Sequence, residues 1–212
     1  PLSFEYFIDN HKVITNCGFG NKISKKGILV SKLTSAQSTL CLNDSSVTKF
    51  ERNNLINKAF GSSIKSSFKV FDVHDKEDIN FLFVSAKHDA YQKKIFYTHE
   101  RKITINKKNG DLSGEDILIS DKNNKKFDTT YSIRFHLYPG INAVQTIDRN
   151  SILIRIEKNK SLIFTAKGEN ISLEKSIFLG RNQIINNSCI TVSGILNNNE
   201  CKNVYWNLKK NN

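Results

Sequence analysis

The sequence lacks methionine and has only two prolines and one tryptophan among its 212 residues. Its first residue is Pro1, so we expect a piece of a longer or processed chain. No run of about 18 apolar residues occurs, and we therefore expect no membrane-spanning helix. Amphipathic helical repeats are also missing, which excludes a helical solenoid or toroid built from these residues.

Cysteine is scarce and never occurs in a C-x-x-C spacing, which argues against a zinc knuckle or a redox pair. The sequence leaves open whether the four cysteines are buried thiols or whether two of them form a bridge in an oxidising compartment. They are Cys17, Cys41, Cys189 and Cys201.

Acidic residues are too few to balance the basic ones, and the formal net charge is +12. Such a charge attracts polyanions, whether nucleic acid, acidic lipid or acidic polysaccharide. The lysines are scattered or paired in turn-like positions such as Lys25-Lys26 and Lys107-Lys108, which is typical of solvated loops. A nucleic-acid partner would need a clustered basic stripe with exposed aromatic residues, so we do not expect one.

The hydrophobic pattern predicts short β-strands throughout. Residues 2–8 alternate apolar and polar positions, as do residues 131–138, where Arg134 and His136 fall on one face. Asn109-Gly110 is a strong hairpin signal and would bring the region of His99 near that of Asp116. Turn residues separate further short strands after residue 140. The expected fold is all-β, a large antiparallel β-sandwich, in one domain over residues 1–212.

Four segments carry a resemblance to a known family: HDAY at 88–91, THERKI at 98–103, LSGEDILIS at 112–120 and IRFHLYPG at 133–140. Their order is similar to that in the C-terminal domain of the heparinase II/III-like proteins, which are bacterial polysaccharide lyases and their relatives. The resemblance implies the β-sandwich of that family without its N-terminal α/α toroid.

The resemblance also implies an activity. Lyases of this type cleave a uronic-acid-containing polysaccharide by β-elimination, and in the family the principal catalytic residues come from the toroid. We therefore expect an acidic polysaccharide and the toroid as partners, with little catalysis by the isolated chain. The polymer, whether heparan sulfate, alginate or another, is left open, and a polysaccharide substrate favours the periplasm.

A metal site is the most specific site that the resemblance implies. In several lyases of this superfamily two histidines and an aspartate of the sandwich bind zinc, and His99, Asp116 and His136 look like the matching positions. Two imidazoles and a carboxylate with an open fourth position suit Zn²⁺. We expect a structural zinc ion there, and the alternative is that each residue forms ordinary hydrogen bonds.

Further site residues follow from the same segments. His88 resembles a cleft-facing histidine that assists proton transfer, with Tyr91 at the cleft edge and Ala90 where the family has glycine. Gln37 stands where the family usually has a histidine, which leaves a neutral hydrogen-bonding group there.

Two arginines are possible ligands for a uronate carboxylate, because a guanidinium matches a carboxylate in a bidentate pair. We expect Arg101 to form a structural ion pair instead, with Glu100, Glu115 or Asp116. Arg134 is expected to bind substrate, with such an ion pair as the alternative. The alternative function is a noncatalytic β-sandwich module that binds acidic glycan or contacts a partner domain.

Overall fold

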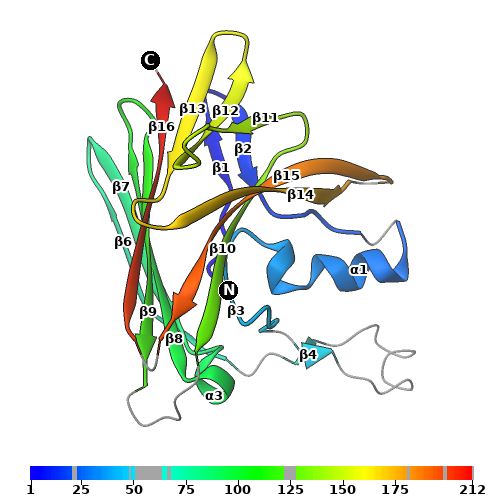
Figure 1. The fold of residues 1–212 in the computed structure, drawn as a ribbon, viewed down its shortest axis with the longest axis vertical. Coiled ribbons are helices and arrows are strands. Elements are labelled where there is room, and N and C mark those ends of the chain that lie inside the picture. The colour runs from blue at the N-terminus through cyan, green and yellow to red at the C-terminus, as the bar shows by residue number, and fades with distance from the viewer. Residues whose placement is uncertain are drawn as a thin grey trace.

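A computed structural model describes residues 1–20, 23–47, 49–50, 64–65, 68–121, 128–180, 182–197 and 200–211. Most of the described chain lies in two antiparallel β-sheets that face each other (Figure 1). The predicted all-β sandwich is confirmed.

The smaller sheet has six strands in the order β1-β2-β10-β15-β14, with β3 also paired to β10. β10 is central because β15 pairs along one side of it, while β2 and β3 share the other side. The strands are β1 Tyr6–Ile8, β2 His11–Thr15, β3 Leu40–Leu42, β10 Thr129–Leu137, β14 Asn170–Leu179 and β15 Ile184–Leu196.

The larger sheet has eight strands in the order β11-β12-β13-β16-β9-β8-β7-β6. Its strands are β6 Val70–Glu77, β7 Phe81–His88, β8 Tyr97–Asn106, β9 Leu112–Ser120, β11 Asn142–Gln145, β12 Ser151–Glu157, β13 Lys160–Thr165 and β16 Lys202–Asn211. The hairpin predicted at Asn109-Gly110 joins β8 to β9, with Gly110 at φ +77°, and pairs Arg101 with Asp116. That prediction is confirmed.

Alternation along β10 explains how one strand serves both the core and the surface. Tyr131, Ile133, Phe135 and Leu137 are buried between the sheets, so the residues between them face away from the core. Phe135 packs against Trp206 of β16 with ring centroids 4.7 Å apart. The core therefore consists largely of residues from both inner sheet faces.

Short helices lie in the connections between strands. They are α1 Lys25–Ser31, the 3-10 turn η1 Thr34–Ala36 and, after β7, α3 Gln92–Ile95. β4 Lys49–Phe50 and β5 Ile64–Lys65 form a separate two-stranded ribbon. In the described part of the chain no helix has the length and hydrophobicity needed to cross a membrane.

Candidate functional site

The predicted site residues occupy two separate regions of the sandwich. Side chains from β7, β8, β9 and the turn after β7 meet in the interior, whereas two side chains of β10 lie on the outer face of the smaller sheet. The first group is His88, Tyr91, His99 and Asp116, and the second is Arg134 and His136.

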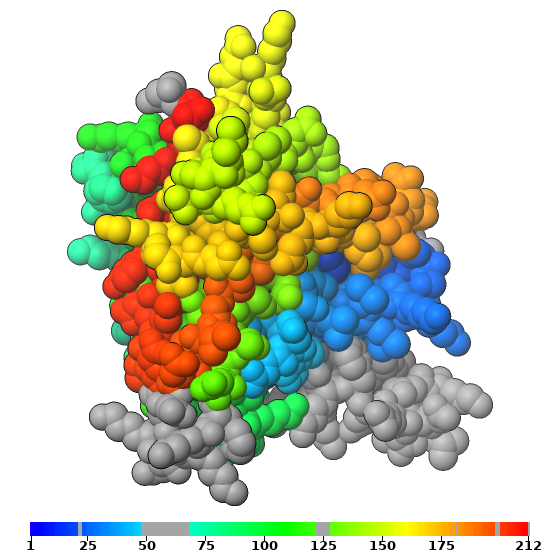
Figure 2. Space-filling view, in the orientation of Figure 1, coloured from blue at the N-terminus to red at the C-terminus, as the bar shows by residue number. Residues whose placement is uncertain are grey.

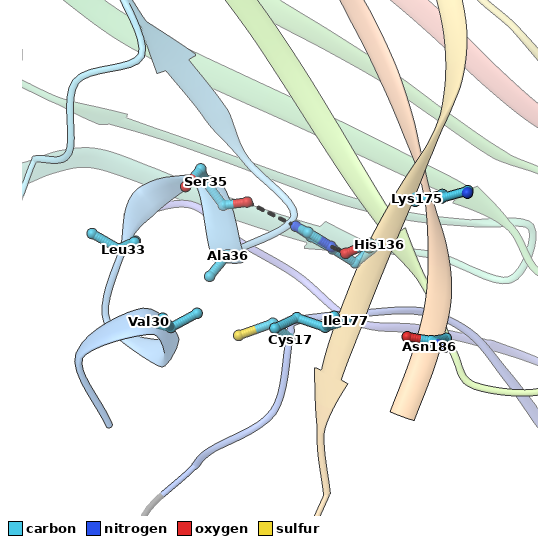
Figure 3. A pocket seen from close by; sticks show the side chains of 10 residues that line it. Cys17, Val30, Leu33, Ser35, Ala36, His136, Lys175, Ile177 and Asn186 are labelled. Atoms are coloured by element: carbon cyan, nitrogen blue, oxygen red, sulfur yellow. Dashed lines mark hydrogen bonds between the residues drawn. The ribbon is translucent and has the colours of Figure 1, made fainter. Parts of the chain in front are cut away.

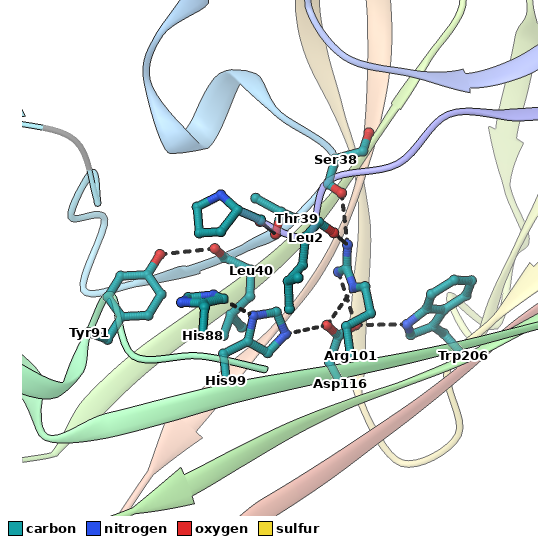
Figure 4. A network of polar contacts seen from close by, with 11 residues as sticks. Leu2, Ser38, Thr39, Leu40, His88, Tyr91, His99, Arg101, Asp116 and Trp206 are labelled. Atoms are coloured by element: carbon teal, nitrogen blue, oxygen red, sulfur yellow. Dashed lines mark hydrogen bonds and ion pairs between the residues drawn. The ribbon is translucent and has the colours of Figure 1, made fainter. Parts of the chain in front are cut away.

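Asp116 is the centre of the interior group, and its side chain is fully buried (Figure 4). Arg101 pairs with it through Nε, 2.7 Å from Oδ1, and Nη2, 3.1 Å from Oδ2. Trp206 donates its indole N–H to Oδ2 over 2.9 Å, and His99 Nε2 lies 2.6 Å from Oδ1. The remaining guanidinium donor, Nη1 of Arg101, reaches the carbonyls of Leu2 and Ser38. The predicted structural ion pair of Arg101 is thus confirmed.

Gly114 makes room for the indole in this network. It lies opposite Trp206 in the β9–β16 pairing, and a Cβ added to it would lie 2.1 Å from Trp206 Cζ2. Only a glycine leaves the space that the ring occupies beside Asp116.

The two interior histidines form a directed hydrogen-bond chain. The amide of Ala90 donates to His88 Nδ1 over 3.2 Å, so His88 carries its proton on Nε2. That nitrogen lies 3.0 Å from His99 Nδ1, which accepts, and His99 Nε2–H then donates to Asp116. The surrounding donors and acceptors therefore assign one neutral tautomer to each ring.

The charges of the interior group follow from this arrangement. Burial by itself would raise the pKa of Asp116, but Arg101 and His99 outweigh it and hold that pKa well below its ordinary value. Burial lowers the pKa of His88 to about 2, and His99 beside it acts in the same direction. Burial also lowers the pKa of His99, against the opposing effect of Asp116. The group is an Asp–Arg ion pair with two neutral imidazoles.

His88 does not face a cleft, contrary to the expectation from sequence. It is 1% exposed, because alternation along β7 turns it inward, where it contacts His99. Tyr91 is also buried, and its hydroxyl donates to the carbonyl of Leu40 over 3.0 Å. Gln37 forms the neutral hydrogen bond expected of it, from Nε2 to the carbonyl of Ser31. The hydrogen bond of Tyr91, which follows β7 of the larger sheet, thus connects it to β3 of the smaller sheet.

The three predicted zinc ligands are not brought together. His99 and Asp116 are in contact, but alternation along β10 places His136 on the outer face of the other sheet. Both nitrogens of His99 are engaged, one as donor and one as acceptor. Within the described ranges no three His, Cys, Asp or Glu residues are grouped so as to hold a metal ion. The residues as placed do not fit one zinc ion, and zinc binding stays a prediction.

Two cavities open on the outer face of the smaller sheet. Figure 2 shows residues of β14 and β15, in orange, next to the blue residues of α1. The first cavity, of about 360 Å³, lies between these elements and is lined by His136 (Figure 3). His136 Nε2 donates to the carbonyl of Ser35 over 3.0 Å, and its Nδ1 accepts from the hydroxyl of Ser176 over 2.9 Å. Burial lowers the pKa of His136 to about 4.

The second cavity, of about 500 Å³, contains Arg134. Arg134 Nη1 donates to Ser132 Oγ over 2.5 Å, and Nη2 lies 3.4 Å from Asp44 Oδ1. The Asp44 side chain is 83% exposed, so this ion pair is worth about 0–1 kcal/mol. The guanidinium is thus fixed by a hydroxyl and held only weakly by a carboxylate, which leaves it available to an anionic ligand.

Sequence reasoning missed most of the residues around Arg134. Thr191 and Ser193 come from β15, and Asn170 and Glu174 from β14, far along the chain from Arg134. The sequence signal that could have found them is the alternation of small polar and apolar residues in β15, with Thr191 and Ser193 on the outer face.

Comparisons with known proteins agree with this fold. The sequence profile described as heparinase II/III-like, C-terminal, matches residues 1–207. The chain belongs to the heparinase II/III-like family. The predicted membership is confirmed, and the match is to the C-terminal domain of that family. Among curated proteins none matches the chain by sequence.

Solved structures of lyases share the fold of this heparinase II/III-like domain. The heparan sulfate lyase HepC from Pedobacter heparinus superposes with a TM-score of 0.75 at 13% identity, over 98% of this chain and 30% of that one. A heparinase III gene product superposes with a TM-score of 0.74 at 9% identity, over 99% of this chain and 30% of that one. A further heparinase III superposes with a TM-score of 0.72 at 14% identity, over 98% of this chain and 29% of that one. The chain therefore spans about 30% of the length of these lyases.

Proposed function

We propose that this chain is the β-sandwich domain of a polysaccharide lyase that cleaves a uronic-acid-containing polysaccharide by β-elimination. The observation that carries the proposal is membership of the heparinase II/III-like family across residues 1–207. The fold shared with a heparan sulfate lyase supports it. The substrate of that neighbour suggests an acidic polysaccharide, and the net charge of +12 favours such a polymer.

The contribution of this chain to the reaction would be binding and charge neutralisation. In β-elimination the uronate carboxylate is neutralised, a base removes the C5 proton, and the O4 leaving group is protonated. Arg134 lines the cavity of about 500 Å³ on the outer face, and its guanidinium suits a carboxylate. A neutralised carboxylate stabilises the negative charge that develops when the C5 proton leaves.

The base and the acid would come from a partner domain. His88, the proton-transfer residue expected from sequence, is buried and engaged with His99. His136 is nearly buried and hydrogen-bonded at both nitrogens. We therefore propose an α/α toroid on the same polypeptide as the source of the catalytic groups. A polysaccharide substrate makes the bacterial periplasm the proposed compartment.

A noncatalytic glycan-binding module is the second candidate. It is favoured by the placement of His88, which is buried in the larger sheet instead of lining the face that carries Arg134 and His136. In that case Arg134 would bind an acidic glycan, and the buried polar network would serve stability alone.

The experiment that separates the two compares the 212 residues with a longer protein that joins them to the proposed toroid. Each is incubated with heparan sulfate or alginate, and the unsaturated uronate product is measured by its ultraviolet absorbance. The lyase proposal predicts product from the longer protein and little from the isolated chain. Binding without unsaturated product in both proteins would favour the module.

A further inference from the structure

The interior carboxylate of Asp116 has no room for a further ligand. Its Oδ1 accepts from Arg101 Nε over 2.7 Å and from His99 Nε2 over 2.6 Å. Its Oδ2 accepts from Arg101 Nη2 over 3.1 Å and from the Trp206 indole over 2.9 Å. A carboxylate offers about four lone-pair sites, so these donors use all of them. A metal ion could bind Asp116 only by displacing a donor that the fold itself supplies.

The charges of this group are also balanced without a metal ion. Arg101 carries one positive charge and Asp116 one negative charge, and their side chains are 3% and 0% exposed. His88 and His99 are neutral, because the hydrogen-bond chain assigns one proton to each ring. A zinc ion would add two positive charges, and the side chains that contact Asp116 include no second carboxylate to offset them. An uncompensated buried charge is costly, and the Arg101 guanidinium already supplies the positive charge that zinc would bring.

Arg101 also reaches the smaller sheet. Its Nη1 donates to the carbonyl of Ser38 over 2.8 Å. The hydroxyl of Ser38 donates to the carbonyl of Thr15 at the end of β2, and it accepts from the amide of His136 in β10 over 2.9 Å. One guanidinium therefore connects Asp116 of the larger sheet to two strands of the smaller sheet. A structural metal ion serves the same purpose, since it holds separate segments of a chain together.

The same guanidinium fixes the segment of residues 2–4. Nη1 of Arg101 also donates to the carbonyl of Leu2 over 2.9 Å, and the guanidinium lies over the ring of Phe4, 5.5 Å from its centroid. Phe4 in turn stacks on Trp206, with ring centroids 5.7 Å apart and an angle of 7° between the rings. Since Trp206 donates to Asp116, the contacts form a closed cycle of four side chains. The arginine and the tryptophan thus hold this segment against the buried carboxylate.

We infer that Arg101 takes the structural place of the zinc ion that the family resemblance implies, and that the domain joins its two sheets and residues 2–4 without a bound metal ion. The inference goes beyond the proposed lyase function and does not depend on it, because it concerns the interior and not the outer face of the smaller sheet. It excludes a zinc site of His99, Asp116 and His136, so metal binding decides between the two.

The first test removes and adds metal. The single tryptophan gives one indole N–H signal in the proton–nitrogen NMR spectrum, and Trp206 donates that proton to Asp116. We expect this signal and the midpoint of thermal unfolding to stay unchanged when the purified 212-residue protein is treated with EDTA and then with excess zinc chloride. A metal that binds only the folded protein would raise the midpoint. A shift of the indole signal together with a higher midpoint in zinc would overturn the inference.

The second test replaces Arg101 by lysine, which keeps the charge but not the planar fork of donors. One ammonium cannot reach both oxygens of Asp116 and the carbonyls of Leu2 and Ser38. We expect Arg101→Lys to lower the midpoint of thermal unfolding by about 4 °C or more and to shift the indole signal. Arg155→Lys, the same exchange at an exposed position of β12, should change neither.

An unchanged midpoint and indole signal in Arg101→Lys would also overturn the inference, because the guanidinium would then hold nothing that another cation cannot hold. A variant that fails to fold would agree with it, and the zinc titration of the wild-type protein remains an independent test.

Discussion

Nε2 of His88 lies 3.0 Å from Nδ1 of His99, and this contact connects the end of β7 to the buried carboxylate of Asp116. The direction of this chain of hydrogen bonds is fixed at both ends. At one end the Ala90 amide donates, and at the other the Asp116 carboxylate can only accept. Two histidines that resemble site residues in sequence therefore form part of the internal framework. The groups available to a ligand lie instead on the opposite sheet, around Arg134.

Removing the charge of Asp116 should strongly destabilise the fold. Asp116→Asn leaves the buried guanidinium of Arg101 without its counter-charge, which costs about 3–5 kcal/mol in the free energy of unfolding. Urea unfolding measures this loss of free energy. Asp75→Asn on exposed β6 is the control, and its free energy of unfolding should lie within about 0.5 kcal/mol of wild type. Equal stability of the two variants would show that the interior network contributes nothing.

A methyl group at Gly114 should also destabilise the protein. Alanine in place of a strand glycine is ordinarily stabilising by about 0.5–1 kcal/mol, but here the added Cβ would overlap Trp206. We expect Gly114→Ala to lower the free energy of unfolding by about 1–3 kcal/mol. The neighbouring Ser113→Ala, on the other face of β9, should have little effect. Tryptophan fluorescence reports the unfolding transition of both variants. A neutral Gly114→Ala would contradict the packing of the indole on this glycine.

Acidification should weaken the fold through His136. Its pKa is about 4 in the folded protein, because burial and then Arg134 lower it against the effects of the Ser35 carbonyl and Glu174. The unfolded chain has the ordinary value of about 6.5, so it binds the proton first as the pH falls. This contribution to stability is therefore complete above about pH 6.5 and is lost as the pH falls towards 4.

The measurement compares the unfolding free energy at pH 7 and pH 4 in wild type and in His136→Gln. Wild type should lose more than the variant, by on the order of 3 kcal/mol. His74→Gln on exposed β6 is the control and should lose as much as wild type. Equal losses in wild type and His136→Gln would mean that the imidazole is not held neutral.

Metal analysis tests the zinc prediction directly. Since both His136 nitrogens are hydrogen-bonded on the outer face, His136→Ala should not change the zinc content of the purified protein. One zinc ion per chain that disappears in His136→Ala would contradict the arrangement described above. It would also restore the ligand set of His99, Asp116 and His136.

Much of the fold could be predicted from local pattern, and the site could not. Alternation along β10 predicted that Arg134 and His136 share a face, and Asn109-Gly110 predicted the pairing of β8 with β9. The pattern did not show that this face of β10 points away from His99, because that depends on which face of the smaller sheet packs against the larger sheet. The partnership of Arg134 with Thr191 depends on strand pairing across nearly sixty positions, which no local signal contains.

We propose that this domain binds the substrate carboxylate of a lyase through Arg134. The most direct test is kcat/KM for unsaturated-product formation on heparan sulfate by the longer protein, as wild type, Arg134→Gln and Arg155→Gln. We expect a fall of about tenfold or more for Arg134→Gln and no change for Arg155→Gln, which makes the same charge change at an exposed position of β12. Equal activity of all three proteins, or no unsaturated product from the wild type on any uronic-acid-containing polymer, would contradict it.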